Sequence, residues 1–270
     1  MNAEIIAVGS EMLTPYRTDT NSLYLTEQLN LLGVDVIFKS IVGDDLRRLV
    51  AAAQHGLFRS DILIFSGGLG PTEDDLTREA VAEALGLTLR RDPEILTRLE
   101  QRFAERGWKM SANNTKQADV LEGASVLQNP NGTAPGQWLS GEFDGREHII
   151  VLLPGPPHEL KALFEAEVRE RLRAKVPPAF LAVRTLKIAM LGESAVDARV
   201  APIYKRYADV ETTILAGAGE IELHFKTRAA TQDAAQRRVD EVAGVVEDEL
   251  DEAVYSRNGE SLEQIVGYWL

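Results

Sequence analysis

Cysteine is absent from the 270 residues, and only four histidines are present. Without cysteine the chain can form no disulfide, no thiol nucleophile and no cysteine-based zinc site, a composition typical of a cytoplasmic protein. No uninterrupted apolar stretch approaches the roughly 20 residues that a membrane-spanning helix needs. No signal-peptide pattern is present either. We therefore expect a soluble, cytoplasmic protein without a membrane partner.

Basic side chains are scarce relative to acidic ones. The 29 Lys and Arg residues face 42 Asp and Glu residues, which gives a formal net charge of −13. Proteins that bind nucleic acids in general rely on Lys and Arg to neutralise backbone phosphates. The composition therefore argues against a nucleic acid as partner. Hydrophobic residues make up 44% of the chain, enough for the cores of one large and one smaller domain.

Strands and helices alternate in the first part of the sequence. Apolar runs predict buried strands at residues 3–8, 34–38, 62–65 and 148–153, and helical patterns lie between the first three. This alternation predicts an α/β fold with three layers, in which a mostly parallel sheet has helices on both faces. Such sheets bind ligands in the loops beyond the carboxyl ends of their strands.

A proline-containing breaker at residues 173–179 predicts a domain boundary. We expect an α/β domain over residues 1–175 that contains the active site, and a smaller two-layer α+β domain of order βαββαβ over residues 180–258. Residues 259–270 are predicted to begin a linker or helix. Their apolar stripe suggests that a further domain follows, or that this segment docks onto the chain or onto a neighbouring subunit.

The stretch from Ser66 to Thr77 contains most of the candidate chemistry. Three glycines follow a predicted strand and let the backbone approach a ligand, and the N–H groups of the next helix favour an anion such as phosphate. Glu73, Asp74 and Asp75 would repel that phosphate unless a divalent cation lay between them. The loop therefore predicts a metal-bridged phosphate site. In the alternative interpretation the acids and Thr77 only cap the helix.

This loop matches neither of the common nucleotide-binding fingerprints. The dinucleotide motif requires a third glycine, where this chain has Glu73, and the loop follows the third predicted strand instead of the first. The Walker A motif requires Gly-Lys-Ser/Thr, which does not follow the glycines. A phosphate site here must be of another kind.

Three other segments are weaker candidates. Residues 19–21, Asp-Thr-Asn, are predicted on the same sheet edge as the glycine loop, where they contact a ligand or only cap a helix. Asn131-Gly132 favours a tight hairpin turn. Lys116 is either a solvated surface residue or the cation that a polyanion site in so acidic a protein requires.

Taken together, seven ordered motifs resemble the CinA family of competence/damage-inducible proteins over nearly the whole chain. The motifs are Gly9-Ser10-Glu11-Met12-Leu13, Asp19-Thr20-Asn21, Val42-Gly43-Asp44-Asp45, the Gly67 to Thr77 loop, Lys116-Gln117-Ala118, Asn131-Gly132-Thr133-Ala134-Pro135-Gly136 and Pro154-Gly155-Pro156-Pro157-His158-Glu159. After the Glu near position 11, family members commonly have Leu-Leu-x-Gly, whereas this chain has Met12-Leu13-Thr14-Pro15.

The resemblance implies a fold and an activity. The first domain is similar to the molybdopterin-binding fold of the MogA and MoaB proteins, which implies that Asp44 and Asp75 face a shared site. The family implies metal-dependent hydrolysis of the pyrophosphate of ADP-ribose to AMP and ribose 5-phosphate. It also implies deamidation of nicotinamide mononucleotide by a carboxy-terminal domain. We expect that domain, and hence the deamidase activity, to be missing from this chain.

The resemblance and the loop chemistry together give expected roles. Gly67, Gly68 and Gly70 are expected to donate backbone N–H groups to the phosphates. A divalent cation, Mg, Mn or Co, is expected to polarise the phosphates and to lower the pKa of a bound water. The expected partners are a small nucleotide-like substrate and a second copy of the chain in a homodimer.

The carboxylates are expected to do the acid–base and metal chemistry. Asp75 is the expected metal ligand, with Asp74 or Glu11 as helpers, and Asp44 orients or deprotonates the water or binds metal. The remaining substrate-binding candidates are Thr72, Thr77, Asp19, Thr20, Asn21, Lys116, Asn131, Thr133, Gly155 and Glu159.

Two alternatives to the enzyme stay open at this point. The first domain could hold a molybdopterin or a nucleotide without turning it over. The chain could also act as an assembly scaffold, through the smaller domain and the apolar stripe of its last ten residues.

Overall fold

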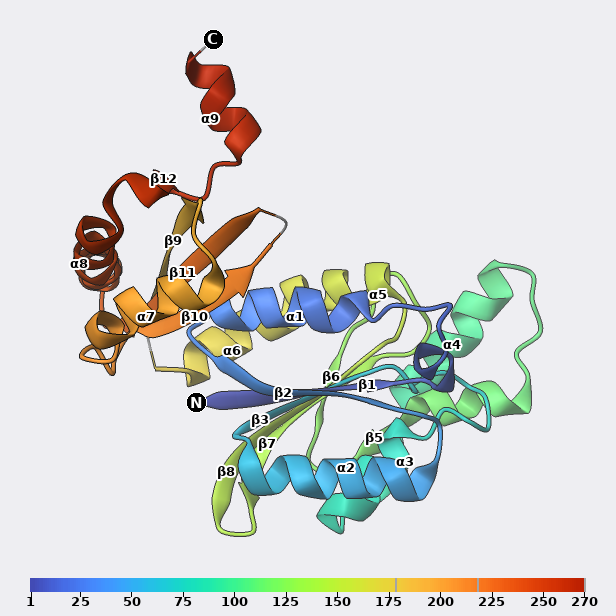
Figure 1. Ribbon diagram of the computed structural model, residues 1–270. Coiled ribbons are helices and arrows are strands. Elements are labelled where there is room, and N and C mark those ends of the chain that lie inside the picture. Colours follow the sequence, from blue (N-terminus) through green and yellow to red (C-terminus); the bar gives the residue numbers. More distant parts are fainter. Residues whose placement is uncertain (178, 218, 270) are drawn as a thin grey trace. The chain divides into compact units, whose positions relative to one another are not determined.

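The computed structural model describes residues 1–177, 179–217 and 219–269. The chain divides into two compact units, Met1–Pro177 and Pro178–Leu270 (Figure 1). The predicted boundary at 173–179 and the predicted terminal segment 259–270 each include one residue outside the described ones, Pro178 and Leu270 respectively. No helix within the described residues is long and apolar enough to cross a membrane.

The first unit contains a six-stranded sheet of order β2-β1-β3-β8-β7-β6. Its strands are β1 (Asn2–Val8), β2 (Asp35–Val42), β3 (Ile62–Ser66), β6 (Ser125–Leu127), β7 (Gly136–Phe143) and β8 (Arg146–Leu153). β2, β1, β3 and β8 run parallel, whereas β7 and β6 are antiparallel to their neighbours. The predicted α/β class is therefore confirmed, with a mixed sheet.

Helices cover both faces of this sheet (Figure 1). α1 (Thr20–Leu31), α5 (Pro157–Leu163) and α6 (Arg169–Lys175) lie on one face, and α2 (Leu46–Arg59) and α3 (Thr77–Leu85) lie on the other. A π-helical turn, η3 (Phe164–Val168), joins α5 to α6. Leu160, Phe164, Val168 and Leu172 recur at steps of four and are all fully buried against the sheet. Burial of this stripe fixes the position of α5 and of the loop before it.

Smaller elements flank the sheet. They are the 3-10 turn η1 (Ser10–Leu13), β4 (Leu89–Arg91), α4 (Pro93–Glu105), the 3-10 helix η2 (Ala112–Ala118) and β5 (Asp119–Leu121). η1 lies next to β2, and β5 lies next to β7. The Asp92 side chain accepts hydrogen bonds from Glu94 N and Ile95 N, and Pro93 occupies the first turn, so the sequence starts α4 sharply. Ile95 and Leu99 then pack on Ala118, which ties α4 to η2.

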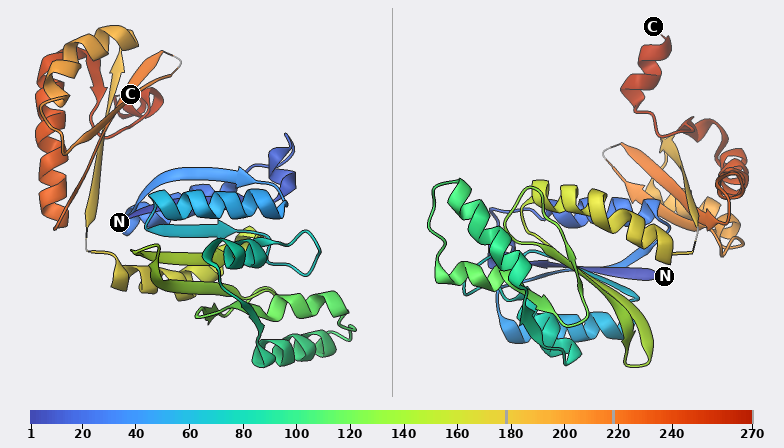
Figure 2. Two further views of the ribbon diagram at one scale, coloured as in Figure 1. Left: turned by 90° about the horizontal axis from the view of Figure 1, so that it is seen from below. Right: turned by 180° about the vertical axis from the view of Figure 1, so that it is seen from behind.

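The second unit is a four-stranded antiparallel sheet of order β10-β11-β9-β12 (Figure 2). Its elements are β9 (Phe180–Ala189), α7 (Glu193–Tyr204), β10 (Glu211–Ala216), β11 (Glu220–Ala229), α8 (Gln232–Leu250), η4 (Asp251–Ala253), β12 (Val254–Ser256) and α9 (Leu262–Trp269). α7 and α8 pack on one face of this sheet. The order βαββαβ agrees with the sequence pattern.

The strand order places three loops at one edge of the first sheet. From β1 the chain crosses to β2 on one side and later to β3 on the other, so the order reverses at β1 and β3. Open α/β sheets bind ligands at such a reversal, outside the carboxyl ends of the strands. The loops after β1, β3 and β8 all begin there.

Candidate functional site

A cavity of about 540 Å³ opens at the carboxyl ends of β1, β3 and β8. Its volume lies within the roughly 300–1,000 Å³ of small-molecule sites. Three loops and the start of α1 form most of its wall, and Gln117 of η2, two residues of the 128–135 loop and two residues of α5 complete it. The predicted site residues on this wall are Glu11, Asp19, Thr20, Asn21, Gly67, Gly68, Gly70, Asp75, Thr133, Gly155 and Glu159.

The glycine loop after β3 presents unpaired backbone donors. Thr77 Oγ1 donates to Gly67 O at 2.8 Å and Thr77 N to Gly68 O at 3.3 Å. In a trans peptide the next N–H points away from the bound carbonyl, and no peptide here is cis. Within the described part of the chain, the N–H groups of Gly68, Leu69 and Gly70 have no acceptor. These donors therefore point away from α3, and all three residues line the cavity.

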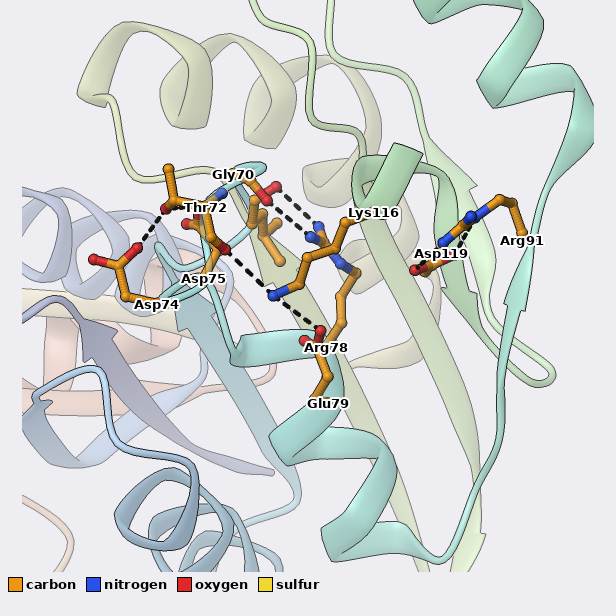
Figure 3. Close-up of polar contacts among 10 residues, drawn as sticks. Gly70, Thr72, Asp74, Asp75, Arg78, Glu79, Arg91, Lys116 and Asp119 are labelled. Carbon is orange, nitrogen blue, oxygen red and sulfur yellow. Dashed lines mark hydrogen bonds and ion pairs between the residues drawn. The ribbon is translucent and has the colours of Figure 1, made fainter. Parts of the chain in front are cut away.

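A buried arginine holds the far side of this loop. Arg78 is 0% exposed, and its Nη1 and Nη2 donate to Leu69 O at 2.9 Å and to Gly70 O at 3.0 Å (Figure 3). Burial lowers the pKa of Arg78, and Glu79 and Asp75 counteract that shift. An arginine remains charged in proteins even so. A fixed positive charge thus lies directly behind the row of N–H groups, which favours an anion in front of it.

The glycines are required by shape as well as by backbone conformation. Gly67 has φ +106° and a Cβ there would collide with Val8 O, whereas Gly68 has φ +68° and a Cβ would collide with Thr77 Oγ1. L side chains rarely adopt such φ values. The loop can approach a ligand closely because no side chain intervenes.

Asn21 ties three segments of the wall together. Its Nδ2 donates to Ser66 Oγ at 2.9 Å and to Gly155 O at 2.8 Å. Asp19 caps α1 by accepting from Ser22 N at 3.0 Å, and it also lines the cavity. The predicted helix cap is therefore present at Asp19, and the predicted ligand contact of residues 19–21 stays a prediction. The buried Asn21 Oδ1 has no hydrogen-bond partner among the described residues.

Asp75 is held with one oxygen occupied. Its Oδ2 accepts from Thr72 N at 2.8 Å and from Thr72 Oγ1 at 2.5 Å, and Oδ1 has no partner among the described residues (Figure 3). A Cβ at Gly70 would collide with this carboxylate, so glycine is needed here too. Asp75 can therefore offer Oδ1 to a cation or a water in the cavity.

The opposite wall is held by Asn129. Its Nδ2 donates to Glu159 Oε2 at 2.7 Å and to Ala134 O at 2.9 Å, and its Oδ1 accepts from Asn131 N and Gly132 N. A side chain at Gly132 would collide with Glu159. The Asn131-Gly132 turn lies in the loop that connects antiparallel β6 and β7, so this hairpin is longer than the predicted tight turn.

The charges of the wall are mostly negative. Glu11, Asp19, Asp75 and Glu159 line the cavity, and Arg17 is its one basic lining side chain. No three His, Cys, Asp or Glu side chains among the described residues are arranged to hold a metal ion. A divalent cation would therefore need ligand oxygens from a substrate. Mg²⁺ commonly binds in this way, through one or two carboxylates plus phosphates.

Several predicted site residues lie elsewhere. Asp44 does not face Asp75 across the cavity, because its Oδ2 accepts from Ser10 N at 2.7 Å while Ser10 Oγ accepts from Asp44 N. Gly67 cannot offer its N–H to a phosphate, because it donates to Leu153 O at 2.9 Å in continuation of the sheet. Asp44 thus holds the loop after β2 against η1, whereas Gly67 lines the cavity but uses its own N–H within the sheet.

The polar residues around Thr72 also lie off the wall. Asp74 accepts from Thr72 Oγ1, which lowers the pKa of Asp74. Lys116 pairs with Glu79 at 3.1 Å and donates to Thr72 O at 3.4 Å, so it braces the loop (Figure 3). Thr77 is buried behind the loop. Thr72, Asp74, Thr77 and Lys116 are therefore supports of the glycine loop.

Asn131 is the remaining candidate away from the wall. It is exposed and donates Nδ2 to His158 O at 3.4 Å. Its neighbour Thr133 does reach the cavity, where its Oγ1 accepts from Gln117 Nε2 at 3.0 Å.

Sequence reasoning missed five residues of the site, and Leu69 in the glycine loop is one of them. Arg17 lines the cavity from the loop after η1, and Ser66 and Gln117 line it from β3 and η2. Arg78 lies behind the glycine loop. Gln117 follows the candidate Lys116 directly, which was a usable signal. Arg78 resembles an ordinary helix-surface arginine, so its sequence position gave none.

Comparisons with known proteins match both units. Residues 4–174 match the family described as "Probable molybdopterin binding domain", and residues 183–256 match "Damage-inducible protein CinA KH domain". A CinA-like protein from Koribacter versatilis is 59% identical over the whole chain and 65% of its own length. A CinA-like protein from Acidobacterium capsulatum is 55% identical, also over the whole chain and 65% of its own length. The chain thus spans less than two thirds of these curated relatives.

A solved structure also resembles the first part of the chain. It is the protein CinA, described as of unknown function, from Thermoplasma acidophilum. The sequences are 32% identical and the TM-score is 0.57, over 63% of this chain and 98% of that one.

Proposed function

This chain belongs to the CinA family, and we propose that its first unit hydrolyses the pyrophosphate of ADP-ribose to AMP and ribose 5-phosphate. The observation that carries the proposal is the row of unpaired N–H groups at Gly68, Leu69 and Gly70, with the buried Arg78 behind it. Backbone donors of this kind bind phosphate oxygens and stabilise the charge that develops on them during reaction.

The chain's own residues divide the work. The glycine-loop donors hold one phosphate group, and Arg17, the basic lining residue, neutralises the other. Asn21 is anchored by two hydrogen bonds and fixes the end of β3 and the loop after β8 relative to α1. Asp75 Oδ1 directs a water at a phosphorus atom. In the reaction the P–O–P bridge breaks, the water oxygen bonds to one phosphorus and gives up a proton to Asp75 Oδ1, and the bridging oxygen leaves with the other phosphorus.

A divalent cation fits this arrangement only in part. Asp75 and Glu11 would hold it together with the substrate phosphates, and when bound it supplies charge neutralisation and a more acidic water. Asp44 has no direct part in this scheme. It keeps Ser10 and the start of η1 in place, next to Glu11.

The direct test is incubation of the purified chain with ADP-ribose and Mg²⁺, Mn²⁺ or Co²⁺ in turn, with AMP measured by chromatography. We expect AMP with at least one metal and a loss of activity of about 100-fold or more in Asp75→Asn. Glu73→Gln is the matched control, because Glu73 is an exposed acid two residues away that does not line the cavity. Absence of AMP with every metal, or equal activity in the two variants, would refute the proposal.

A second candidate is binding without turnover. The family description of residues 4–174 names molybdopterin, a phosphorylated ligand that the same row of donors could hold. This candidate predicts a pterin that co-purifies with the chain and fluoresces after release, or a nucleotide that binds and is recovered intact. AMP formation that Asp75→Asn abolishes would exclude it as the whole function.

A further inference from the structure

A second cavity lies on the other side of the loop that carries Asn129 and Gly132. Its volume is about 560 Å³, close to that of the first. α4 forms one wall and residues 128–135 form the other. Gly132 is part of this wall, and Thr133 lines both cavities. The 128–135 loop is therefore a partition between two spaces of ligand size.

The lining of the second cavity has the opposite charge balance to the first. Arg98 and Arg102, one turn apart on α4, face a single acid, Glu105. In the first cavity four carboxylates face one arginine. The four carboxylates of the first cavity offset the attraction that Arg17 and Arg78 exert on an anion, whereas two arginines against one acid make the second cavity attractive to an anion.

The two arginines are held in place but keep donors free. Arg102 donates Nη1 to Gly132 O and Nη2 to Pro130 O, and no carboxylate within the described residues lies at ion-pair distance from it. Arg98 donates to Gln128 Oε1 and pairs with Glu94 at 3.6 Å. A guanidinium has more N–H donors than these contacts use. Their planar forks suit the oxygens of phosphate.

The remaining lining suits an uncharged body attached to that anion. Ile95 and Leu99 are buried at the base of α4, and Pro130, Pro135 and Ala166 add apolar surface. Gln101 and Gln128 supply amide groups at the rim. A sugar or a base fits such a lining better than a bare ion does.

We propose that this second cavity binds a phosphomonoester, with Arg98 and Arg102 on the phosphate and the sugar or base against Ile95 and Leu99. The site goes beyond the proposed reaction and does not require it. A ligand there contacts the loop that Arg102 holds at Gly132 and that Asn129 holds at Glu159. A ligand bound in the second cavity therefore contacts a loop that also forms part of the wall of the first cavity.

The test is calorimetric titration of the full chain after divalent cations have been removed from protein and buffer with a chelating resin. The probes are AMP, ribose 5-phosphate and inorganic phosphate, with adenosine and citrate as controls for the base alone and for a carboxylate anion. We expect one equivalent of AMP or ribose 5-phosphate to bind, and phosphate more weakly. Adenosine and citrate are expected to bind at least about tenfold more weakly than the phosphomonoesters.

The variants locate the binding. Arg98→Ala should weaken binding of the phosphomonoester by about tenfold or more, and Arg98→Lys should retain part of the affinity that Arg98→Ala loses. Arg106 is an exposed arginine at the end of α4 that does not line the cavity. Arg106→Ala and Asp75→Asn should each change the affinity for the phosphomonoester less than twofold. No binding without metal, equal losses in the Arg98 and Arg106 variants, citrate binding as tightly as the phosphomonoesters, or a loss in Asp75→Asn would each overturn the proposal. Because no turnover is measured, these outcomes are independent of whether ADP-ribose is hydrolysed.

Discussion

At the cavity of the first unit, polar groups keep hydrogen-bonding capacity unused, whereas on the open face of the second sheet the charged side chains bind one another. The open face is the one away from α7 and α8, and the network on it is formed by Thr185, Lys187, Glu220, Glu222, His224 and Tyr255. Lys187 Nζ lies 2.8 Å from Glu222 and 3.3 Å from Glu220, and His224 Nε2 lies 3.0 Å from Glu222. Thr185 and Tyr255 complete the network at His224 and Glu220.

The pKa shifts follow the same division. The hydrogen bond from Lys187 lowers the pKa of Glu222 and raises that of Lys187. Burial and the hydrogen bond to Glu220 raise the pKa of Tyr255 to about 12. The directions of these shifts show that Lys187 and Glu222 stabilise each other in their charged forms, and that Glu220 favours the protonated form of Tyr255. The first cavity and the open face both contain many charged residues, and they differ in the hydrogen-bond donors that the first cavity leaves unpaired among the described residues.

The region of the second unit that matches the KH family contains no Gly-x-x-Gly motif. KH domains clamp the nucleic-acid backbone with a Gly-x-x-Gly loop. No two glycines between residues 178 and 270 stand three apart.

Replacing Gly68 by alanine should remove the spare donors of the first unit. The new Cβ would collide with Thr77 Oγ1, so the loop must move. We expect ADP-ribose hydrolysis to fall by about 100-fold or more, as when an oxyanion donor is lost. The matched control is Gly86→Ala, which has a similar φ of +66° but open space around it. It should cost about 1–2 kcal/mol of stability and leave kcat/KM unchanged. Equal losses of activity would contradict the special role of the loop.

Replacing Arg78 by methionine should leave Leu69 O and Gly70 O without their donors. Each unpaired buried carbonyl costs about 1–3 kcal/mol. We expect a lower free energy of unfolding of the first unit, measured in urea, and nucleotide affinity weakened more than tenfold. Arg91→Met removes a half-exposed pair with Asp119 (Figure 3) and should cost no more than about 1 kcal/mol. Unchanged nucleotide affinity in Arg78→Met, together with a lower free energy of unfolding, would contradict the role of Arg78 in anion binding.

Replacing Arg17 by alanine should weaken nucleotide binding by about tenfold without changing stability. Arg17 is exposed, lines the cavity and has no hydrogen bond or ion pair among the described residues. The difference between wild type and variant should shrink in high salt. Arg47→Ala, an exposed arginine on α2 away from the cavity, serves as control. Equal binding by the two variants at low salt would remove Arg17 from the site.

The smallest effect is expected on the open face. Because the folded pKa of Glu222 is depressed, its contribution to stability is present above the ordinary glutamate value of about 4.3 and is lost as pH falls through the lower folded value. Glu222→Gln should remove up to about 1 kcal/mol at neutral pH and flatten the acid side of the profile of thermal unfolding. It should leave nucleotide binding unchanged. A loss of binding would break the division between the two regions.

Local patterns were enough to predict the strands and helices that build the site. The apolar runs at β3 and β8 and the Leu160 to Leu172 stripe depend only on near neighbours in the sequence. The side-chain contacts that hold the loops of the site in place join residues that are far apart in the sequence. Asp44 meets Ser10 across 34 residues, and Lys116 meets Thr72 across 44. The short strands β4 and β5 pair with each other across the intervening α4 and η2, with Arg91 opposite Asp119.

Arg78 shows the limit most clearly. Its neighbours in sequence place it on an ordinary amphipathic helix, where an arginine is expected to be solvated. Its burial follows from two loop carbonyls that precede it by eight and nine residues and that turn inward only in the folded glycine loop. The sequence pattern predicted where the loop is, and the direction of its peptide groups required the structure.

The central claim is that the backbone N–H groups of Gly68, Leu69 and Gly70 receive the phosphates of a nucleotide ligand. Titration of the ¹⁵N-labelled chain with ADP-ribose, with and without Mg²⁺, measures those amide resonances directly. We predict that these three amides shift more than any others, while those of residues 220–224 do not move. The claim is contradicted if the ligand binds and the three glycine-loop amides keep their free positions.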